Sequence, residues 1–290
     1  MSLIGTMGSG VSALRTFMKG LEVIGDNIAN VNTTGYKASD AKYADSFSNI
    51  LQRSSPSGAT TGNTPSVGVG TGVMLAGINT NFSQGSLAGT GTATDLGISG
   101  NGFFHVKNAL DSSEYATRAG DFRWDDQGFL VTQQGYRVQG ATGAGLATVG
   151  DVQLGTPPAG AERQSVTIDK GGNVVEFYSD GTSATTNQVL LQNFNDPAAL
   201  VREGNNLYSG LLAAGAIGAA AGSSALDATA NAPGKNGLGS IQSGTLELSN
   251  VDLTDQFANL ITTQRSFQAG SRLVTVSDTV LEDIVNLKQR

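Results

Sequence analysis

Apolar side chains recur every seven residues at the start of the chain. One column consists of Met7, Leu14, Leu21 and Ile28. A second column consists of Leu3, Phe17, Ile24 and Val31, interrupted by a glycine at position 10. A strict seven-residue repeat keeps one side of a helix turned toward a partner helix. The pattern therefore predicts a long N-terminal helix with an apolar seam.

The end of the chain carries a similar pattern. One column consists of Leu253, Leu260, Phe267, Val274 and Leu281. The complementary column has Phe257 and Val285 at its ends and polar residues between them. Polar residues lower the stability of a seam but can fix its register. We expect the two terminal helices to pair as a coiled coil, the alternative being two amphipathic helices that pack on one globular core.

Local signals mark where these helices begin and end. Gly35 is expected to close the first helix in the left-handed conformation, after the turn residues Asn32 to Thr34. Ser249 or Asn250 is expected to cap the second helix, with Asp252 in its first turn.

The middle of the chain changes to short alternating runs separated by Gly, Asn and Asp, which is typical of strands and hairpin turns. The whole pattern predicts an α+β fold in which long N- and C-terminal helices, paired as a coiled coil, flank a central all-β domain. We expect five segments: an N-terminal helix at 1–35, a linker with a possible short helix at 36–72, a β-rich domain at 73–208, a Gly/Ala-rich linker with a returning strand at 209–248, and a C-terminal helix at 249–290.

Composition excludes several classes of function. Charged residues make up 14% of the 290 residues and the net charge is -7, so no basic stripe is present to neutralise nucleic-acid phosphates or to hold an anionic membrane. The chain has no Cys and one His, which removes thiol nucleophiles, disulfides and most zinc sites. We therefore expect a protein that is not an enzyme and has no catalytic, cofactor or metal site.

The remaining candidates for chemistry have simpler explanations. His105 lies in an alternating apolar run and is expected to be an exposed or half-buried strand residue. Asp125, Asp169 and Asp180 stand beside Gly in predicted turns and do not follow a calcium-loop spacing. The alternative classes are a secreted β-rich hydrolase with two catalytic carboxylates and a surface adhesin. Neither class accounts for the seven-residue repeats at both ends of the chain.

The sequence also bears on location. The first ten residues lack the basic and continuous apolar regions of a cleavable signal peptide, and the apolar stretch at 211–221 is too short to span a bilayer. We expect no membrane insertion and, if the protein is extracellular, export without a cleaved signal.

Four motifs, in order along the chain, resemble those of the bacterial flagellar rod and hook protein family. The N-terminal signature runs from Gly25 to Lys37, and two internal motifs run from Gly100 to Phe104 and from Gly204 to Tyr208. The C-terminal signature comprises 249–253 and 263–269. The residues that carry the terminal resemblance are Asn27, Asn30, Asn32, Gly35, Asn250, Asp252, Gln264 and Arg265.

This resemblance implies a subunit that polymerises into the helical tube of the flagellar axis, with terminal helices lining the tube and a β domain outside. It also implies export through the flagellar apparatus, and contacts with a cap protein and with other axial proteins at junctions. Within the family, residues 43–47 resemble a box of hook proteins, whereas the short interval at 140–165 resembles distal rod proteins. On balance the sequence favours the hook, with the distal rod as the alternative.

Overall fold

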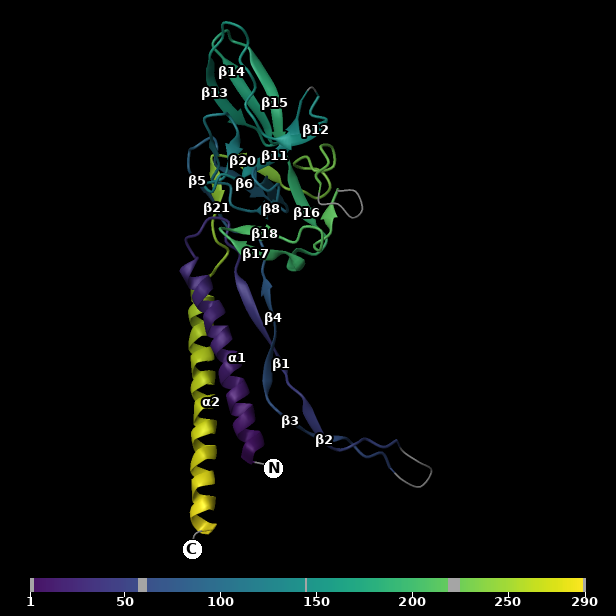
Figure 1. The fold of residues 1–290 in the computed structure, drawn as a ribbon, viewed down its shortest axis with the longest axis vertical. Coiled ribbons are helices and arrows are strands. Elements are labelled where there is room, and N and C mark those ends of the chain that lie inside the picture. Colours follow the sequence, from purple (N-terminus) through teal and green to yellow (C-terminus); the bar gives the residue numbers. More distant parts are fainter. Residues whose placement is uncertain (1–2, 57–61, 144, 219–224, 289–290) are drawn as a thin grey trace. The chain divides into compact units, whose positions relative to one another are not determined.

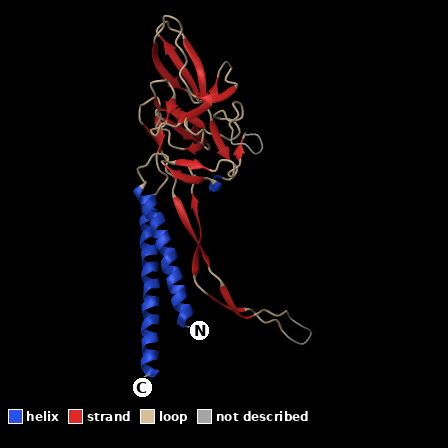
Figure 2. Cartoon of the chain, in the orientation of Figure 1, coloured by secondary structure: helices blue, strands red, loops and turns tan. Residues whose placement is uncertain are grey.

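The computed structural model of the chain describes residues 3–56, 62–143, 145–218 and 225–288 (Figure 1). The chain divides into two compact units. The described parts of 1–29, 39–81 and 251–290 form the first, and those of 30–38 and 82–250 form the second. Figure 2 shows both long helices in the first unit, whereas the second is built from strands. The structure is therefore α+β, as predicted.

The first unit contains the helices α1 (Leu3–Ala29) and α2 (Leu253–Lys288). It also contains the strands β1 (Ser39–Asp45), β2 (Ser48–Gln52), β3 (Val67–Gly70) and β4 (Val73–Thr80). β1 pairs antiparallel with β4, and β2 pairs antiparallel with β3, so the described parts of 39–80 form a long two-stranded ribbon.

The ribbon corrects two sequence-based expectations. The 36–72 segment was expected to hold a possible short helix. Tyr43, Phe47 and Ile50 recur there at helical spacing, but they lie in or beside β1 and β2. The helical spacing is overridden because residues 67–80 supply a hydrogen-bonding partner that a local pattern does not reveal. For the same reason the first unit includes 73–81, which the sequence assigned to the β-rich domain.

The second unit contains the remaining strands and one short 3-10 helix. Its strands are β5 (Leu87–Gly89), β6 (Leu96–Ser99), β7 (Phe103–Lys107), β8 (Glu114–Thr117), β9 (Arg123–Trp124), β10 (Leu130–Val131), β11 (Arg137–Thr142), β12 (Thr148–Asp151), β13 (Arg163–Ile168), β14 (Asn173–Tyr178), β15 (Ser183–Val189), β16 (Leu191–Phe194), β17 (Val201–Gly204), β18 (Leu207–Ser209), β19 (Ala216–Ile217), β20 (Ser240–Ser243) and β21 (Thr245–Glu247). The 3-10 helix is η1 (Pro197–Ala199). Among the described residues, the main path of the large sheet runs β13-β14-β15-β11-β7-β8-β18-β17.

β7 separates two hydrophobic clusters of the second unit. Phe104 and Val106 belong to one cluster and Phe103 belongs to the other, as the alternation of side chains along a strand predicts. His105 is only 2% exposed, which corrects the expectation of an exposed or half-buried residue. Both faces of β7 are covered, because residues returning from the 194–214 region pack over the second face.

The segment 209–248 is part of this unit and not only a linker. Leu211 and Ala214 belong to the second hydrophobic cluster, and β20 and β21 pair with β6 and β5. Residues 219–224 lie outside the described residues, as does a part of the apolar stretch 211–221.

The predicted hairpin turns are confirmed and explain their aspartates. Gly128, Gly172 and Gly181 have φ between 77° and 82°, the left-handed region that favours glycine. The Asp125 carboxylate accepts hydrogen bonds from backbone N–H groups within its own turn, and the Asp169 and Asp180 carboxylates do the same in theirs.

Candidate assembly site

α1 and α2 contact one another in an antiparallel register that repeats every seven residues. Thr6 meets Ser277 through their hydroxyl groups, 3.4 Å apart. Two turns along, Ala13 and Leu14 lie against Gly270. The Asn27 amide donates to Gln256 Oε1 at 3.1 Å at the other end of the pair. Figure 1 shows the two helices side by side over most of α1.

Small residues form the line of closest approach. A Cβ built on Gly10 would lie 3.0 Å from Val274 Cγ2, and one built on Gly270 would lie 3.5 Å from Leu14 Cδ2. Gly20 is buried, and a Cβ there would meet Thr263 Cγ2 at 3.6 Å. Because glycine has no side chain, the backbones of α1 and α2 can approach closely at these three positions.

The predicted seam residues therefore do not all lie between the helices. Ile24 is buried, and the half-buried ones are Met7, Leu14, Phe17, Leu21, Ile28, Val31, Leu260, Phe267, Val274 and Leu281. Leu253, Phe257 and Val285 are exposed. In α2 the complementary column is taken by Gln256, Thr263, Gly270 and Ser277, one residue before the column read from the sequence. The Leu3 side chain lies outside the described part.

Asn27, the buried asparagine of the N-terminal motif, connects α1 to β1 and to α2 by hydrogen bonds. Its side-chain amide donates to Ser39 O at 2.8 Å as well as to Gln256, and its Oδ1 accepts from Ser39 N at 2.9 Å. It thus satisfies both main-chain polar groups of the residue that starts β1. This explains an asparagine near the end of a helix, where its intrinsic propensity is poor.

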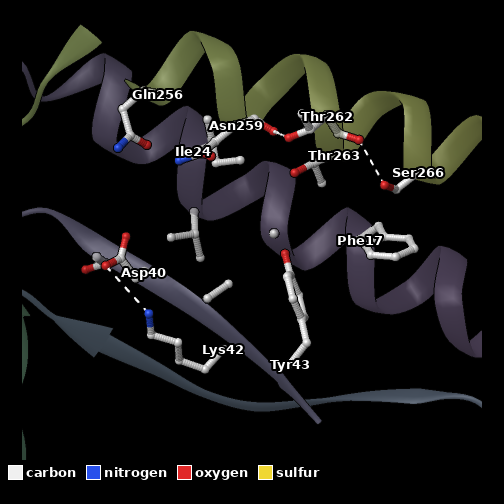
Figure 3. Close-up of a pocket in the computed structure, with 14 residues that line it drawn as sticks. Phe17, Ile24, Asp40, Lys42, Tyr43, Gln256, Asn259, Thr262, Thr263 and Ser266 are labelled. Atoms are coloured by element: carbon white, nitrogen blue, oxygen red, sulfur yellow. Dashed lines mark hydrogen bonds and ion pairs between the residues drawn. The ribbon is translucent and has the colours of Figure 1, made fainter. Parts of the chain in front are cut away.

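Beside this network α1, α2 and β1 enclose a polar pocket of about 500 Å³ (Figure 3). Tyr43 reaches from β1 toward α1 and its ring meets Phe17 edge to face, with 5.9 Å between centroids. Burial raises the pKa of the Tyr43 hydroxyl. The α2 side is lined by Asn259, Thr262, Thr263 and Ser266, which present neutral hydrogen-bonding groups. The β1 side adds an ion pair, with 4.0 Å between Lys42 Nζ and Asp40 Oδ2.

A buried ionic cluster stands in the second unit, where the chain enters and leaves it. Lys37 Nζ donates to Glu247 Oε1 at 2.7 Å and to Ser83 O at 2.7 Å. Arg118 Nη1 donates to Glu247 Oε2 at 3.2 Å. The side chains of Lys37 and Glu247 are fully buried, and that of Arg118 nearly so. Burial lowers the pKa of Lys37, although its hydrogen bond to Glu247 opposes that effect.

Main-chain bonds surround the same cluster. Gly35 N donates to Glu247 O at 2.8 Å, and Ala38 N donates to Asn250 Oδ1 at 2.7 Å. Gly35 has φ +68°, as predicted, but α1 ends at Ala29, so Gly35 lies in the turn after the helix. A Cβ on Gly35 would lie 2.6 Å from Ala119 N, so only glycine fits.

The other motif residues have smaller roles. Asn30 Oδ1 accepts from Thr33 Oγ1 in the turn after α1, and Asn32 is exposed. Asp252, and not Ser249 or Asn250, caps α2, because its Oδ1 accepts from Thr254 N at 2.8 Å. Gln264 and Arg265 are exposed on α2.

The paired strands β2 and β3 leave apolar side chains in solvent. Phe47 is 86% exposed and Leu51 is 68% exposed, and Ile50, Val67 and Val69 are exposed as well. An isolated two-stranded hairpin is marginally stable in water. This hairpin and the exposed apolar residues of α2 are therefore candidate contact surfaces between molecules.

Sequence reasoning missed several residues of these sites. The small residues between the helices escaped because apolar periodicity selects large side chains. The cluster of Lys37, Arg118 and Glu247 was missed because its members are far apart in the sequence.

Within the described residues, no group of three metal-ligating side chains is present and no helix is long and apolar enough to cross a membrane.

Comparison with known proteins places this geometry in context. Three family models match: the flagellar basal body rod protein at 7–37, the flagellar hook protein FlgE/F/G D1 domain at 97–176, and the flagellar basal body rod FlgEFG protein C-terminal region at 242–287. The chain is 37% identical over 287 residues to the flagellar basal-body rod protein FlgG of Bacillus subtilis, covering 99% of this chain and 100% of the relative.

Two further relatives bear on the choice between rod and hook. The chain is 33% identical over 290 residues to the FlgG protein of Caulobacter vibrioides, covering 96% of this chain and all of the relative. It is 24% identical to the flagellar hook protein FlgE of Borreliella burgdorferi, covering 97% of this chain and 98% of the relative, and this alignment extends over 456 positions.

Proposed function

The chain belongs to the flagellar rod and hook protein family, and from this membership we propose that it is a distal rod subunit. As a family member it is a structural subunit of the bacterial flagellum that polymerises with other flagellar proteins into an axial structure. The choice of the distal rod is supported by its end-to-end similarity to FlgG of Bacillus subtilis.

Chain length supports the same choice against the hook. The alignment with the hook protein needs 456 positions for a chain of 290 residues, so that hook protein carries segments without a counterpart here. In the second unit β11 leads to β12 and then to β13 through short connections, without an inserted domain. The preference for the hook drawn from residues 43–47 therefore gives way to the distal rod; those residues form the end of β1 and the turn to β2.

The terminal helices supply the proposed contacts of the polymer. An antiparallel pair joined by small residues keeps many larger apolar side chains half-buried or exposed at its sides. Further copies bury these side chains by packing alongside, as in a coiled coil. Repetition of such a heterologous contact gives an open helical polymer. Export without a cleaved signal and contacts with a cap protein belong to the same proposal.

Labelling isolated basal bodies tests the assignment. An epitope tag in the exposed turn at 109–111 keeps the ends of the chain free. Gold label is expected on the straight segment below the hook, and the cells should keep swimming. Label along the curved hook would instead restore the hook assignment.

Leu260→Asp is expected to abolish polymerisation. Leu260 is half-buried and lies between Gln256 and Thr263, which both lie along α1. A carboxylate placed in this interface loses its water, at a cost of several kcal/mol. Sedimentation and electron microscopy measure the loss, while the melting of the β-rich unit should persist. Ala258→Asp adds the same charge at an exposed site two residues earlier and should assemble. Normal polymers from the Leu260 variant would contradict the proposed role of the helix pair.

A further inference from the structure

An apolar groove of about 600 Å³ lies between α1 and β4 in the first unit. Its apolar lining consists of Met7, Val11, Val73, Met74 and Leu75. Val11 and Met74 are exposed to solvent. One charged side chain, that of Arg15, stands among the lining residues; it is exposed and forms no ion pair with the described residues. The groove therefore suits an apolar ridge that carries an acid.

The C-terminal half of α2 presents such a ridge, which we call the C-terminal stripe. It consists of Leu273, Val276, Val280, Ile284 and Leu287, all exposed. At 100° per residue these five side chains lie within one narrow band of the helix. Asp283 lies at the edge of this band, one heptad after Val276; it too is exposed, and it forms no ion pair within the described part of the chain. Residues 273–287 contain three acids and no Lys or Arg.

We propose that the C-terminal stripe of one copy of this chain seats in the α1/β4 groove of a second copy, with Asp283 against Arg15. The proposal rests on the proposed polymerisation and adds the pair of surfaces that meet. The docking buries the exposed apolar residues of both surfaces and pairs a cation with an anion, neither of which forms an ion pair with another described residue of its own chain. Charge complementarity of this kind sets the register of an interface.

The stripe of the same chain does not fill the groove. α2 contacts the side of α1 that carries Gly10 and Ala13, whereas β4 lies along another side, where Thr16 Oγ1 donates to Val73 O. Figure 1 shows α2 and β4 on opposite sides of α1. The occupant is therefore a second molecule.

Charge reversal tests the pairing. Arg15→Asp and Asp283→Arg are each expected to raise the critical concentration for polymerisation by about tenfold, because each places like charges in contact. The double variant should return to within about threefold of the wild type. Lys19→Asp, combined with Asp283→Arg, is the matched control, because Lys19 is exposed on α1 outside the groove, and it should give no rescue. Equal defects in the two double variants would overturn the proposal.

Disulfide cross-linking shows whether the contact joins two molecules. The chain has no Cys, so single substitutions give a clean background. A mixture of Val11→Cys and Ile284→Cys chains, assembled and oxidised, should form a covalent dimer of one copy of each. Phe257→Cys, equally exposed but outside the stripe, should not link to Val11→Cys. Polymers of the mixture without the Val11–Ile284 link would refute the docking and leave the distal rod assignment intact, whereas absence of any wild-type polymer would refute both.

Discussion

Glu247→Ala is expected to lower the free energy of unfolding of the β-rich unit by about 3–5 kcal/mol, because it leaves buried cations without a counter-ion. Glu247 accepts from Lys37 and from Arg118, and its Oε1 also accepts from Gly85 N at 2.8 Å. All three donors would lose the carboxylate, and Lys37 would keep only a neutral acceptor, Ser83 O. Since a typical domain is stable by only about 5–15 kcal/mol, much of the margin disappears.

Urea unfolding followed by circular dichroism measures this loss. Glu203→Ala removes an exposed carboxylate in the same unit, which accepts a hydroxyl hydrogen bond from Ser209 at 2.6 Å, and should change stability by less than about 0.5 kcal/mol. If both variants unfolded at the urea concentration of the wild type, the buried ionic cluster would not contribute measurably to the stability of the unit.

Gly270→Phe is expected to eliminate polymerisation, whereas Gly270→Ala should retain it. The space beside Gly270 holds a methyl group, because a Cβ would lie 3.5 Å from Leu14 Cδ2 and 3.8 Å from Ala13 Cβ. Alanine is therefore in ordinary contact, and it favours a helix over glycine by about 1 kcal/mol. A benzyl group has no room there and forces the helices apart.

Pelleting assays and electron microscopy distinguish the two variants. Ala269→Phe places the same bulk on the exposed neighbouring position of α2 and serves as the control. Because Gly270 belongs to the first unit, the cooperative melt of the β-rich unit should remain in all three variants. Assembly of Gly270→Phe at the wild-type concentration would exclude close packing of α1 on α2 as a requirement for the polymer.

The helix pair illustrates what periodicity reveals and what it conceals. The existence of both helices follows from columns such as Leu260, Phe267 and Val274, since no other structure repeats apolar residues at that spacing over so many turns. The side of closest approach does not follow, because contact between two helices depends on shape as well as polarity. Gly10 interrupts an apolar column in the sequence, yet it is one of the points of closest approach.

Strand pairing and the buried ion pairs could not be predicted from the sequence for a different reason. Tyr43 and Phe47 have a helical spacing, and the antiparallel partner that holds Tyr43 in a strand is Leu75, 32 residues later. Likewise Lys37 and Glu247 are 210 residues apart, and no local pattern joins them. Pairings at such separations are decided by the free energy of the whole fold.

Local sequence patterns were enough to predict the α+β class, the two long helices, the strand character of the middle and the hairpin turns, because each of these depends on periodicity or on the backbone preferences of nearby residues. The motifs at both ends also indicated the protein family. The folded structure was needed to show that small residues line the helix interface, that the described parts of 39–80 form a ribbon, and that Lys37, Arg118 and Glu247 meet in the interior. These features depend on close packing and on burial of charge, and both exist only after distant segments have come together.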